Sequence, residues 1–406
     1  MAETRRVLIT GVSRFWGAQL ARRLEMHPSI ERIVAIDTQA PQIELQRTDY
    51  VRADIRHSLI GKLLTALDID TVVHAGLIVD PRRASPRMVH ETNVIGTMNL
   101  IAACSSPTSP VRKLIVKSST AIYGAEPDDP SIWSEDMPRK APPRDTFTRD
   151  LDEIEAYVHD FSVRRPDATT TLLRFANVLG PSHVTPFARL FDLSVVPTVM
   201  GFDPRLQFLQ EKDAVTVLEH AVLHDHEGTY NVAGSGVVVL SQAISMLGKV
   251  NLPLLPFVGA ELTMSIVNRM VPLGFAPHLT RLLQYGRVVD TSAVQARFGL
   301  ALEHTTPETL LAHARQRRVR DIVKSQQLYT YETELEDFLR SQRAAHGNGR
   351  PASEVALETP SAVEAPAALE TPRAARSANG ARPRRRTPRT GGGNGARRPR
   401  ATRRES

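Results

Sequence analysis

A glycine turn between a strand and a helix can hold a diphosphate on backbone N–H groups, and residues 7–17, VLITGVSRFWG, have that form. Gly11 ends an apolar run, and an amphipathic helix is predicted from about Phe15 to Leu24. The spacing to Gly17 matches T-G-x-x-G-x-x-G, except that Arg14 occupies the middle glycine position. A helix that merely begins after a glycine would give the same pattern.

Two carboxylates follow later apolar runs. Asp37 comes directly after residues 33–36, IVAI, where an acid can accept hydrogen bonds from both hydroxyls of an adenosine ribose. Asp54, followed by Ile55, ends a shorter strand and could face an adenine ring. Either acid could instead cap a helix or a turn, but their order after the glycine turn favours a dinucleotide site.

Hydroxyl groups mark the end of another predicted strand. Ser118, Ser119 and Thr120 follow the apolar residues 114–116. Ligands of doubly wound sheets bind beyond the carboxyl ends of the strands, so we expect these hydroxyls at the site. His74 ends a further apolar run, where a core histidine is commoner than a catalytic one.

The positive charge is concentrated at the C-terminal end. The 406 residues carry a formal +7, whereas residues 347–406 hold 13 Arg, no Lys and 5 Glu, a balance of +8 that leaves the rest near −1. This tail has no aromatic residue and is expected to be disordered. A flexible polycation could bind nucleic acid or an anionic membrane surface, or simply remain solvated.

Composition suggests a cytoplasmic protein. Cys104 is the only cysteine, so no intrachain disulfide can form, and the first strand leaves no room for a signal peptide. Residues 252–277 could form an interfacial segment, which would make the protein membrane-peripheral, although helices of a substrate lobe are commoner. No metal site is expected: His220, His224 and His226 have no cysteine nearby and are interpreted as solvated residues favoured by a helix C-terminus.

Taken in order, these motifs resemble those of extended short-chain dehydrogenases/reductases, the NAD-dependent epimerase/dehydratase family. The matched motifs are Thr10-Gly11…Gly17, Asp37, Asp54-Ile55-Arg56, His74-Ala75, Asn93…Gly96-Thr97, Ser118-Ser119…Tyr123-Gly124, Arg174…Asn177…Gly180-Pro181, Glu211…Asp213 and Tyr230-Asn231-Val232. The resemblance covers about residues 6–302 and extends to an epimerase-like subgroup of actinobacterial type whose members carry names such as UDP-glucose 4-epimerase.

The resemblance implies an α/β fold: a Rossmann-type doubly wound parallel sheet, a smaller C-terminal substrate lobe and the disordered tail. It implies bound NAD and a nucleotide sugar. Carried over by position, the cofactor residues are Thr10, Gly11, Arg14, Phe15, Trp16, Gly17, Asp37, Asp54, Ile55, His74, Ala75, Asn93 and Ser118, and the substrate residues are Asn177 and Arg205. A basic residue such as Arg14 often accompanies NADP, but Asp37 would repel its 2′-phosphate and favours NAD.

Three parts of the chain are expected on this basis. Residues 1–176 would form the NAD-binding Rossmann domain, completed by residues 207–233. Residues 177–345 would form mainly the substrate lobe and a C-terminal helix, and residues 346–406 the Arg-rich tail. A homodimer is left open.

The catalytic positions depart from the family pattern. Family members use Tyr-x-x-x-Lys on the helix after the proline-rich loop, where the tyrosine exchanges a proton with the substrate hydroxyl and the lysine lowers its pKa. Here those positions hold Phe147 and Leu151, and none of the seven tyrosines has a lysine four residues later. Ser119 matches the remaining catalytic position. Substitute proton donors could come from nearby polar residues, namely Arg149, Asp150, Glu135 and Asp136.

Three functions remain open at this point. The chain could be an NAD-binding family member with altered or lost chemistry that acts as a sensor or scaffold. It could be a working epimerase, dehydratase or reductase with a substitute acid. It could also be an interaction protein whose tail recruits nucleic acid or an anionic membrane.

Overall fold

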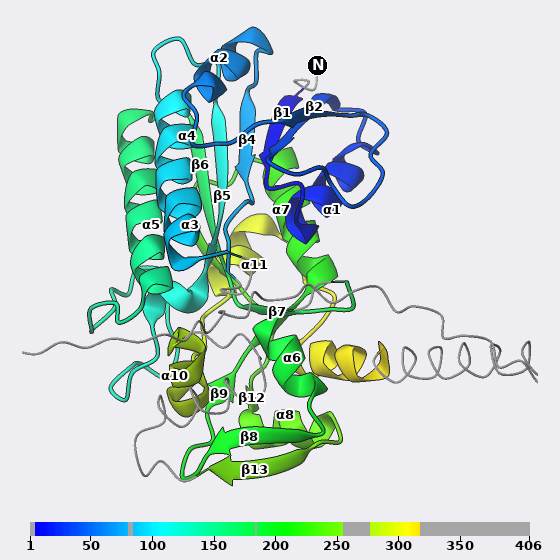
Figure 1. The fold of residues 1–406 in the computed structure, drawn as a ribbon, viewed down its shortest axis with the longest axis vertical. Helices are drawn as coiled ribbons and strands as arrows, with labels where there is room; N and C mark the ends of the chain where they lie inside the picture. The colour runs from blue at the N-terminus through cyan, green and yellow to red at the C-terminus, as the bar shows by residue number, and fades with distance from the viewer. Residues whose placement is uncertain (1–4, 80–83, 183–184, 255–276, 317–406) are drawn as a thin grey trace, which may run out of the picture. The chain divides into compact units, whose positions relative to one another are not determined.

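A computed structural model describes residues 5–79, 84–182, 185–254 and 277–316 (Figure 1). The chain divides into two compact units, residues 1–336 and 337–406, and the second lies outside the described residues. The Arg-rich tail and most of the helix expected after residue 307 therefore lie outside the described part, as do residues 255–276. The helix itself begins at residue 306 and is described as far as residue 316.

Seven strands form one parallel sheet in the order β11-β6-β5-β4-β1-β2-β3. Their bounds are β1 Arg5–Thr10, β2 Ile30–Asp37, β3 Thr48–Arg52, β4 Thr71–His74, β5 Lys113–Ser119, β6 Thr169–Phe175 and β11 Gly228–Val232. The chain moves from β1 outward to β3 and then returns to β4 on the other side of β1. This reversal is the switch point of a doubly wound fold, so the predicted Rossmann-type sheet is confirmed.

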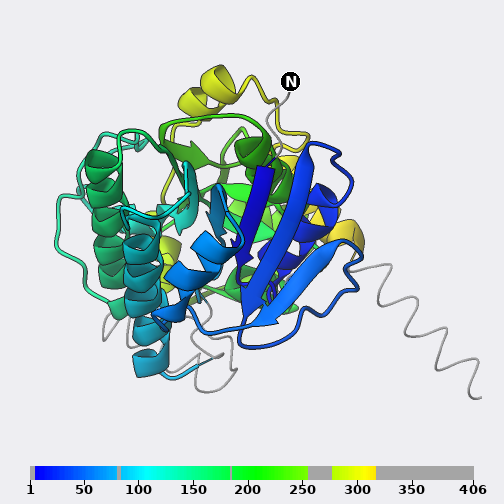
Figure 2. The ribbon, with the colours of Figure 1, turned by 90° about the horizontal axis from the view of Figure 1, so that it is seen from above.

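Helices cover both faces of the sheet because its strands are apolar on both sides (Figure 2). One face packs against α1 Phe15–Leu24, α7 Glu211–Leu223 and α11 Ser292–Phe298. The other packs against α2 Leu59–Ala66, α4 Gly96–Cys104 and α5 Thr146–Arg164. Within β5, Ile115 faces the first layer while Leu114 and Val116 face the second. Lys117 and Ser119 share the Ile115 side of the strand, since side chains alternate.

Short strand pairs, three labelled helices and the helix that begins at residue 306 build a second apolar core. The strands are β7 Asn177–Leu179, β8 Val195–Val199, β9 Arg205–Leu206, β10 Phe208–Gln210, β12 Val238–Val239 and β13 Val250–Leu254. The helices are α6 Pro186–Asp192, α8 Leu240–Met246 and α10 Pro277–Tyr285. The remaining elements are α3 Pro86–His90, a π-helical turn Glu91–Ile95 and a 3-10 turn Thr120–Tyr123. The proposed domain boundary at residues 176/177 stays a prediction.

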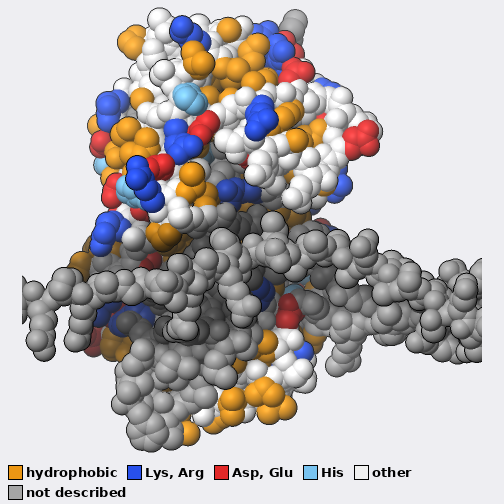
Figure 3. All heavy atoms as spheres, in the orientation of Figure 1, with side chains coloured by type: hydrophobic (Ala, Val, Ile, Leu, Met, Phe, Trp, Pro, Cys, Tyr) orange, Lys and Arg blue, Asp and Glu red, His pale blue; other side chains and the backbone are white. Residues whose placement is uncertain are grey.

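The surface of the described part mixes charges of both signs. On the face shown in Figure 3, Lys and Arg side chains lie among Asp and Glu side chains. This agrees with the near-neutral balance of the residues before the tail.

Candidate functional site

The turn after β1 brings three backbone segments into close contact. Gly11 has a φ of +79°, and a Cβ atom on it would lie 2.4 Å from the Cα of Gly76. A Cβ on Gly17 would lie 2.6 Å from the carbonyl oxygen of Gly11. Only glycine fits either position, so the two glycines of the motif are used as the sequence predicts. Helix α1 then begins at Phe15, and the side chain of the N-cap residue Arg14 makes no capping hydrogen bond to the first turn.

A cavity of about 360 Å³ opens beside this turn. We call it the Asp37 cavity; its walls include Thr10, Gly11, Arg14, Asp37, Asp54, Ile55, Arg56 and Gly76. The Asp37 carboxylate is held in place, since its Oδ2 accepts from the backbone N (2.9 Å) and Oγ (2.6 Å) of Ser13 and its Oδ1 accepts from the N of Thr38 at 2.7 Å. An anchored carboxylate, an open helix N-terminus and glycines that permit close approach fit the adenosine and diphosphate of a dinucleotide.

Asp54 lies in the wall of this cavity, but its carboxylate is already paired. Arg56 donates to both of its oxygens, with a shortest distance of 2.6 Å. The Arg56 guanidinium accordingly holds the pKa of Asp54 below its usual value. The carboxylate therefore serves the local turn, and Ile55 supplies an apolar wall surface.

His74, Ala75 and Asn93, which we expected to contact a cofactor, are not among the residues that line the Asp37 cavity. His74 is fully buried, hydrogen-bonded to the hydroxyls of Thr10 (2.7 Å) and Thr97 (2.8 Å). Ala75 is buried beside it. Asn93 binds the backbone N and O of Ile78 through its side-chain amide, at 2.8 and 3.0 Å. These side chains pack behind the cavity wall, which includes Gly76 and Ile78 here, and Asn93 holds the Ile78 backbone in place.

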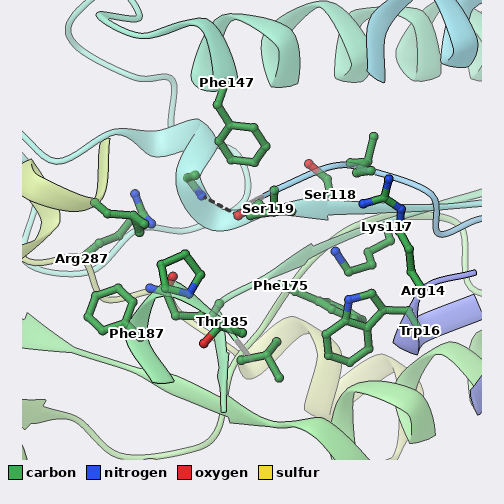
Figure 4. A pocket seen from close by; sticks show the side chains of 18 residues that line it. Arg14, Trp16, Lys117, Ser118, Ser119, Phe147, Phe175, Thr185, Phe187 and Arg287 are labelled. Carbon is green, nitrogen blue, oxygen red and sulfur yellow. Dashed lines mark hydrogen bonds between the residues drawn. The ribbon is translucent and has the colours of Figure 1, made fainter. Parts of the chain in front are cut away.

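A second pocket adjoins the N-terminus of α1, with Arg14 lining both spaces (Figure 4). We call it the Ser119 pocket. Its lining includes Trp16, Lys117, Ser118, Ser119, Phe147, Phe175, Asn177, Thr185, Phe187 and Arg287. Ser119 Oγ accepts from the backbone N of Ala121 at 3.2 Å, so its own proton is free to be donated elsewhere. Of the expected aromatic residues at the start of α1, Trp16 lines this pocket and Phe15 packs edge-on against Trp16.

The two replaced catalytic positions lie on the buried side of α5. Helix α5 begins after Asp145, whose carboxylate caps it by accepting from the N of Thr148 at 3.0 Å. Phe147 is 7% exposed and lines the pocket, and Figure 4 shows its ring projecting toward the segment of Ser119. Leu151 is 1% exposed and belongs to the apolar core. Neither side chain can exchange a proton.

The proposed substitute proton donors are not among the residues that line the Ser119 pocket. Burial raises the pKa of Asp150, but its Oδ1 pairs with Nδ1 of His90 on α3 at 2.7 Å. Glu135 accepts from the backbone N of Asn231 at 2.8 Å. Asp136 pairs with the Ser134 hydroxyl, and Arg149 is exposed. Each side chain is directed to a local partner or to solvent.

A buried polar network lies beneath the pocket floor. Ser118 Oγ donates to Glu155 of α5 at 2.6 Å, and Arg174 of β6 donates to the same carboxylate at 2.7 Å. Arg174 also donates to the Tyr123 hydroxyl at 2.7 Å, which donates in turn to Oδ1 of Asn231 at 2.8 Å. The network joins β5, α5, β6 and β11. The Ser118 hydroxyl therefore donates its proton to Glu155, whereas the Ser119 hydroxyl lines the Ser119 pocket.

Besides Arg14, the Ser119 pocket is lined by Arg287 and not by Arg205. Arg205 is exposed and donates to the carbonyl oxygen of Ser131 at 2.8 Å. Arg287 lies beside it, donating its backbone N to the Arg205 carbonyl oxygen at 3.0 Å. Its guanidinium is buried and donates to the carbonyl oxygen of Gly124 at 2.8 Å, and burial lowers its pKa to about 10. Asn177, the other expected substrate residue, does line the pocket.

Sequence reasoning also missed Lys117. It is 4% exposed and lines the pocket from β5. A signal was present, since a lysine inside an otherwise apolar strand, LIVKSS, is rarely buried without a role. Arg287 carried no such signal, because the segment before it has no recognisable motif.

The histidine group at the end of α7 is only partly solvated: His224 is exposed, as expected, whereas the rings of His220 and His226 are half-buried and stacked. The rings of His226 and Phe298 are stacked with centroids 3.9 Å apart, and His226 lies within 3.1 Å of His220. Burial lowers the pKa of His226 to about 4 and also lowers that of His220. Within the described ranges one other group, Asp213, Glu303 and His304, brings three ligand-type atoms within 4.8 Å, but Asp213 already accepts from both backbone N–H groups there.

Comparison with known proteins settles the family. Residues 7–233 match the NAD dependent epimerase/dehydratase family. The chain belongs to this family. Its description as NAD-dependent agrees with the cofactor expected from Asp37 and the glycine turn. None of the described helices is long and apolar enough to cross a membrane.

Relatives of this family member include proteins with and without an assigned activity. An uncharacterised protein of Mycobacterium tuberculosis is 37% identical over 338 residues, which are 80% of this chain and 88% of the relative. UDP-glucose 4-epimerase 3 of Oryza sativa is 27% identical over 189 residues, 43% of this chain and 49% of the relative.

Solved structures share the fold. A UDP-glucose 4-epimerase of Thermotoga maritima with UDP-glucose has a TM-score of 0.60 at 16% identity, covering 78% of this chain and 99% of the other. A UDP-glucuronic acid 4-epimerase from Bacillus cereus in complex with NAD has a TM-score of 0.57 at 18% identity, covering 77% and 99%.

Proposed function

We propose that the chain binds NAD, takes a nucleotide-sugar-like ligand beside it, and has little or no conventional epimerase or dehydratase turnover. The observation that carries this proposal is the pair Phe147 and Leu151, buried where the family has its tyrosine and lysine. The protein would then act as a sensor or scaffold that responds to its ligands. An active enzyme with a substitute acid is the main alternative.

The binding half of the proposal uses side chains that are already in position. Asp37 would accept from the ribose hydroxyls of the adenosine, and the backbone N–H groups at the start of α1 would hold the diphosphate. The other end of the dinucleotide would reach the Ser119 pocket, because Arg14 lines both spaces. Bound there, NAD supplies a hydride acceptor. Asn177 and Arg287 would face the nucleotide sugar.

The expected lack of turnover follows from the absence of a proton acceptor at positions 147 and 151. Ser119 can donate a hydrogen bond to a ligand oxygen, but a hydroxyl alone does not remove a proton at neutral pH. A phenyl ring at position 147 has no ionisable group, and Leu151 leaves no ammonium to lower the pKa of a replacement. Loss of a positioned acid–base group costs roughly 10²–10⁴ in rate.

Restoring both groups tests the proposal. The full chain with Phe147→Tyr and Leu151→Lys would be assayed beside the wild type and both single variants, against UDP- and dTDP-sugars with added NAD. We expect turnover to appear in the double variant and to be weaker in either single variant, because the lysine acts through the tyrosine. Circular dichroism would confirm that the variants fold.

Wild-type turnover on the order of 1 s⁻¹ or more would contradict the catalytic half of the proposal. Calorimetry with NAD tests the binding half separately. No heat of binding at millimolar NAD would contradict it, whatever the turnover assay shows.

A further inference from the structure

Lys117 is a buried cation for which the proposed function has no use. It lies on β5, two residues before Ser119, and its amine lies over two adjoining aromatic rings. Nζ lies 5.6 Å from the centroid of the Trp16 ring and 5.6 Å from that of Phe175. Among the described residues, no oxygen atom accepts a hydrogen bond from it. A lysine buried in this way, aimed into a pocket, is costly unless something in the pocket uses the charge.

The charges around Lys117 make its surroundings positive. Burial, and then the charge of Arg14, lower the pKa of Lys117 to about 8, so the amine is mostly protonated at neutral pH. His74 on the neighbouring strand β4 has a pKa lowered to about 4 and is neutral. The remaining neighbours on α1 and β6 are the rings of Trp16 and Phe175.

Lys117 is placed on the cofactor side of the pocket rather than at the lost proton-transfer position. Figure 4 shows it on the side of Arg14 and Trp16, with Phe147 on α5 beyond Ser119. Its amine lies against α1, the helix whose N-terminus would hold the diphosphate. A cation here acts on whatever part of the dinucleotide enters the Ser119 pocket.

We propose that Lys117 makes the Ser119 pocket select the reduced dinucleotide, NADH, over the oxidised form. The nicotinamide ring of NAD⁺ carries a positive charge, and the dihydronicotinamide ring of NADH does not. A protonated Lys117 beside the ring repels only the oxidised form, while contacts to the adenosine and diphosphate are common to both. This inference rests on the proposed binding of NAD, and it makes the protein a receptor for the reduced cofactor.

The size of the effect follows from Coulomb's law. Two unit charges about 7 Å apart at an effective dielectric constant of about 20 repel each other strongly enough for a preference of about tenfold at pH 7. The preference is not expected to be larger, because an amine with a pKa of about 8 can lose its proton instead. The preference falls as the pH rises through about 8, because the amine loses its proton and its repulsion of NAD⁺. Arg14 stays charged over this range and acts on both forms through the shared diphosphate.

The test compares Lys117→Met with the wild type in the full chain. NADH binding would be measured by fluorescence and NAD⁺ binding by calorimetry, at pH 7 and pH 9.5. We expect the ratio Kd(NAD⁺)/Kd(NADH) to be up to about tenfold lower in K117M than in wild type at pH 7. The wild-type ratio should fall at pH 9.5, whereas the K117M ratio should not change. Methionine keeps the length and apolar contacts of the buried stem, so the variant should fold.

Lys113→Met is the matched control. Lys113 begins the same strand and is equally buried, but its Nζ binds Asp225 at 2.7 Å at the far end of β5. Replacing Lys113 should leave the ratio Kd(NAD⁺)/Kd(NADH) unchanged.

Two results in K117M would overturn the proposed selectivity for NADH. An equal loss of affinity for both forms would mean that the lysine binds the diphosphate, and an unchanged ratio would mean that the lysine does not discriminate between the two forms. If neither form binds to the wild type, the proposed function fails instead.

Discussion

Asp37 is oriented before any ligand arrives. Ser13 and Thr38 donate four hydrogen bonds to its carboxylate, two to each oxygen, which fix its orientation at the wall of the Asp37 cavity. Charge-assisted hydrogen bonds of this kind are stronger than neutral ones, so the residue should contribute both affinity and a preference between cofactors.

Replacing this carboxylate should weaken NAD and relax the discrimination against NADP. We expect Asp37→Ala to raise the Kd for NAD by roughly 10- to 100-fold, which corresponds to about 1.5–3 kcal/mol for hydrogen bonds to a charged group. The NADP affinity should fall less, because the repulsion of its 2′-phosphate is removed. Calorimetry with both dinucleotides measures the two effects.

Asp49→Ala on the neighbouring strand is the control for this variant. Asp49 is an aspartate paired with Arg32 on the surface, outside the Asp37 cavity. Unchanged NAD affinity in the Asp37 variant would argue against an adenosine site in this cavity.

Two interactions hold helix α5 against the sheet. One is the ion pair between Glu155 and Arg174, and the other is the packing of its apolar face. The Glu155 and Arg174 side chains are 9% and 13% exposed, and Glu155 also accepts from Ser118. Because Ser118 and Ser119 are adjacent on β5, the network sets where Phe147 and Ser119 face each other. The network therefore fixes the geometry of the Ser119 pocket around Phe147 and Ser119.

Breaking this pair from one side should be costly. We expect Arg174→Met to lower the free energy of unfolding by about 3–5 kcal/mol, because it leaves the Glu155 charge buried without its partner. Combining it with Glu155→Gln should recover part of the loss, since no buried charge then remains. Urea unfolding of the variants gives these differences.

Arg164→Met on the same helix is the matched control. Its surface pair with Asp160 is well exposed, so its loss should change the stability by about 0.5 kcal/mol or less. An Arg174 variant as stable as this control would show that the buried pair does not hold α5.

At the scale of the whole molecule, His74 ties the stability of the central sheet to pH. It lies on β4, between β1 and β5, and its two hydrogen bonds hold it as a neutral ring. Burial lowers its pKa in the folded protein to about 4, against about 6.5 unfolded. The stability linked to this group is complete above pH 6.5 and is lost as the pH falls toward 4, because the unfolded chain takes up the proton first.

Acid should therefore destabilise the protein through this residue. From pH 7 to pH 4 we expect about 3 kcal/mol of the unfolding free energy to depend on His74. In His74→Gln that share of the pH dependence should disappear, whereas His159→Gln, which removes an exposed histidine of α5, should keep it. Urea unfolding across this pH range measures the slope, and identical slopes in wild type and His74→Gln would contradict the assignment.

Much of the fold could be read from local patterns. The apolar runs that became β1, β2 and β5, the glycine turn and Asp37 were all recognisable, because strand burial and close backbone approach restrict residue types within a few positions of each other. The assignment of Phe147 and Leu151 to the tyrosine and lysine positions needs only the spacing along α5, and it stays a prediction. The Arg-rich tail was recognised by composition, and its role stays a prediction.

Only the tertiary structure decided which polar side chains reach the pocket. Arg205 and Arg287 are neighbours across a backbone hydrogen bond, yet only Arg287 lines the Ser119 pocket, while Asp150 and Glu135 are directed to His90 and Asn231. Whether Lys117 is buried against rings or exposed depends on α1 and β6, which lie about 100 and 60 residues away along the chain. Sequence spacing determines the side of a strand on which a residue lies, but packing between distant segments determines what it meets there.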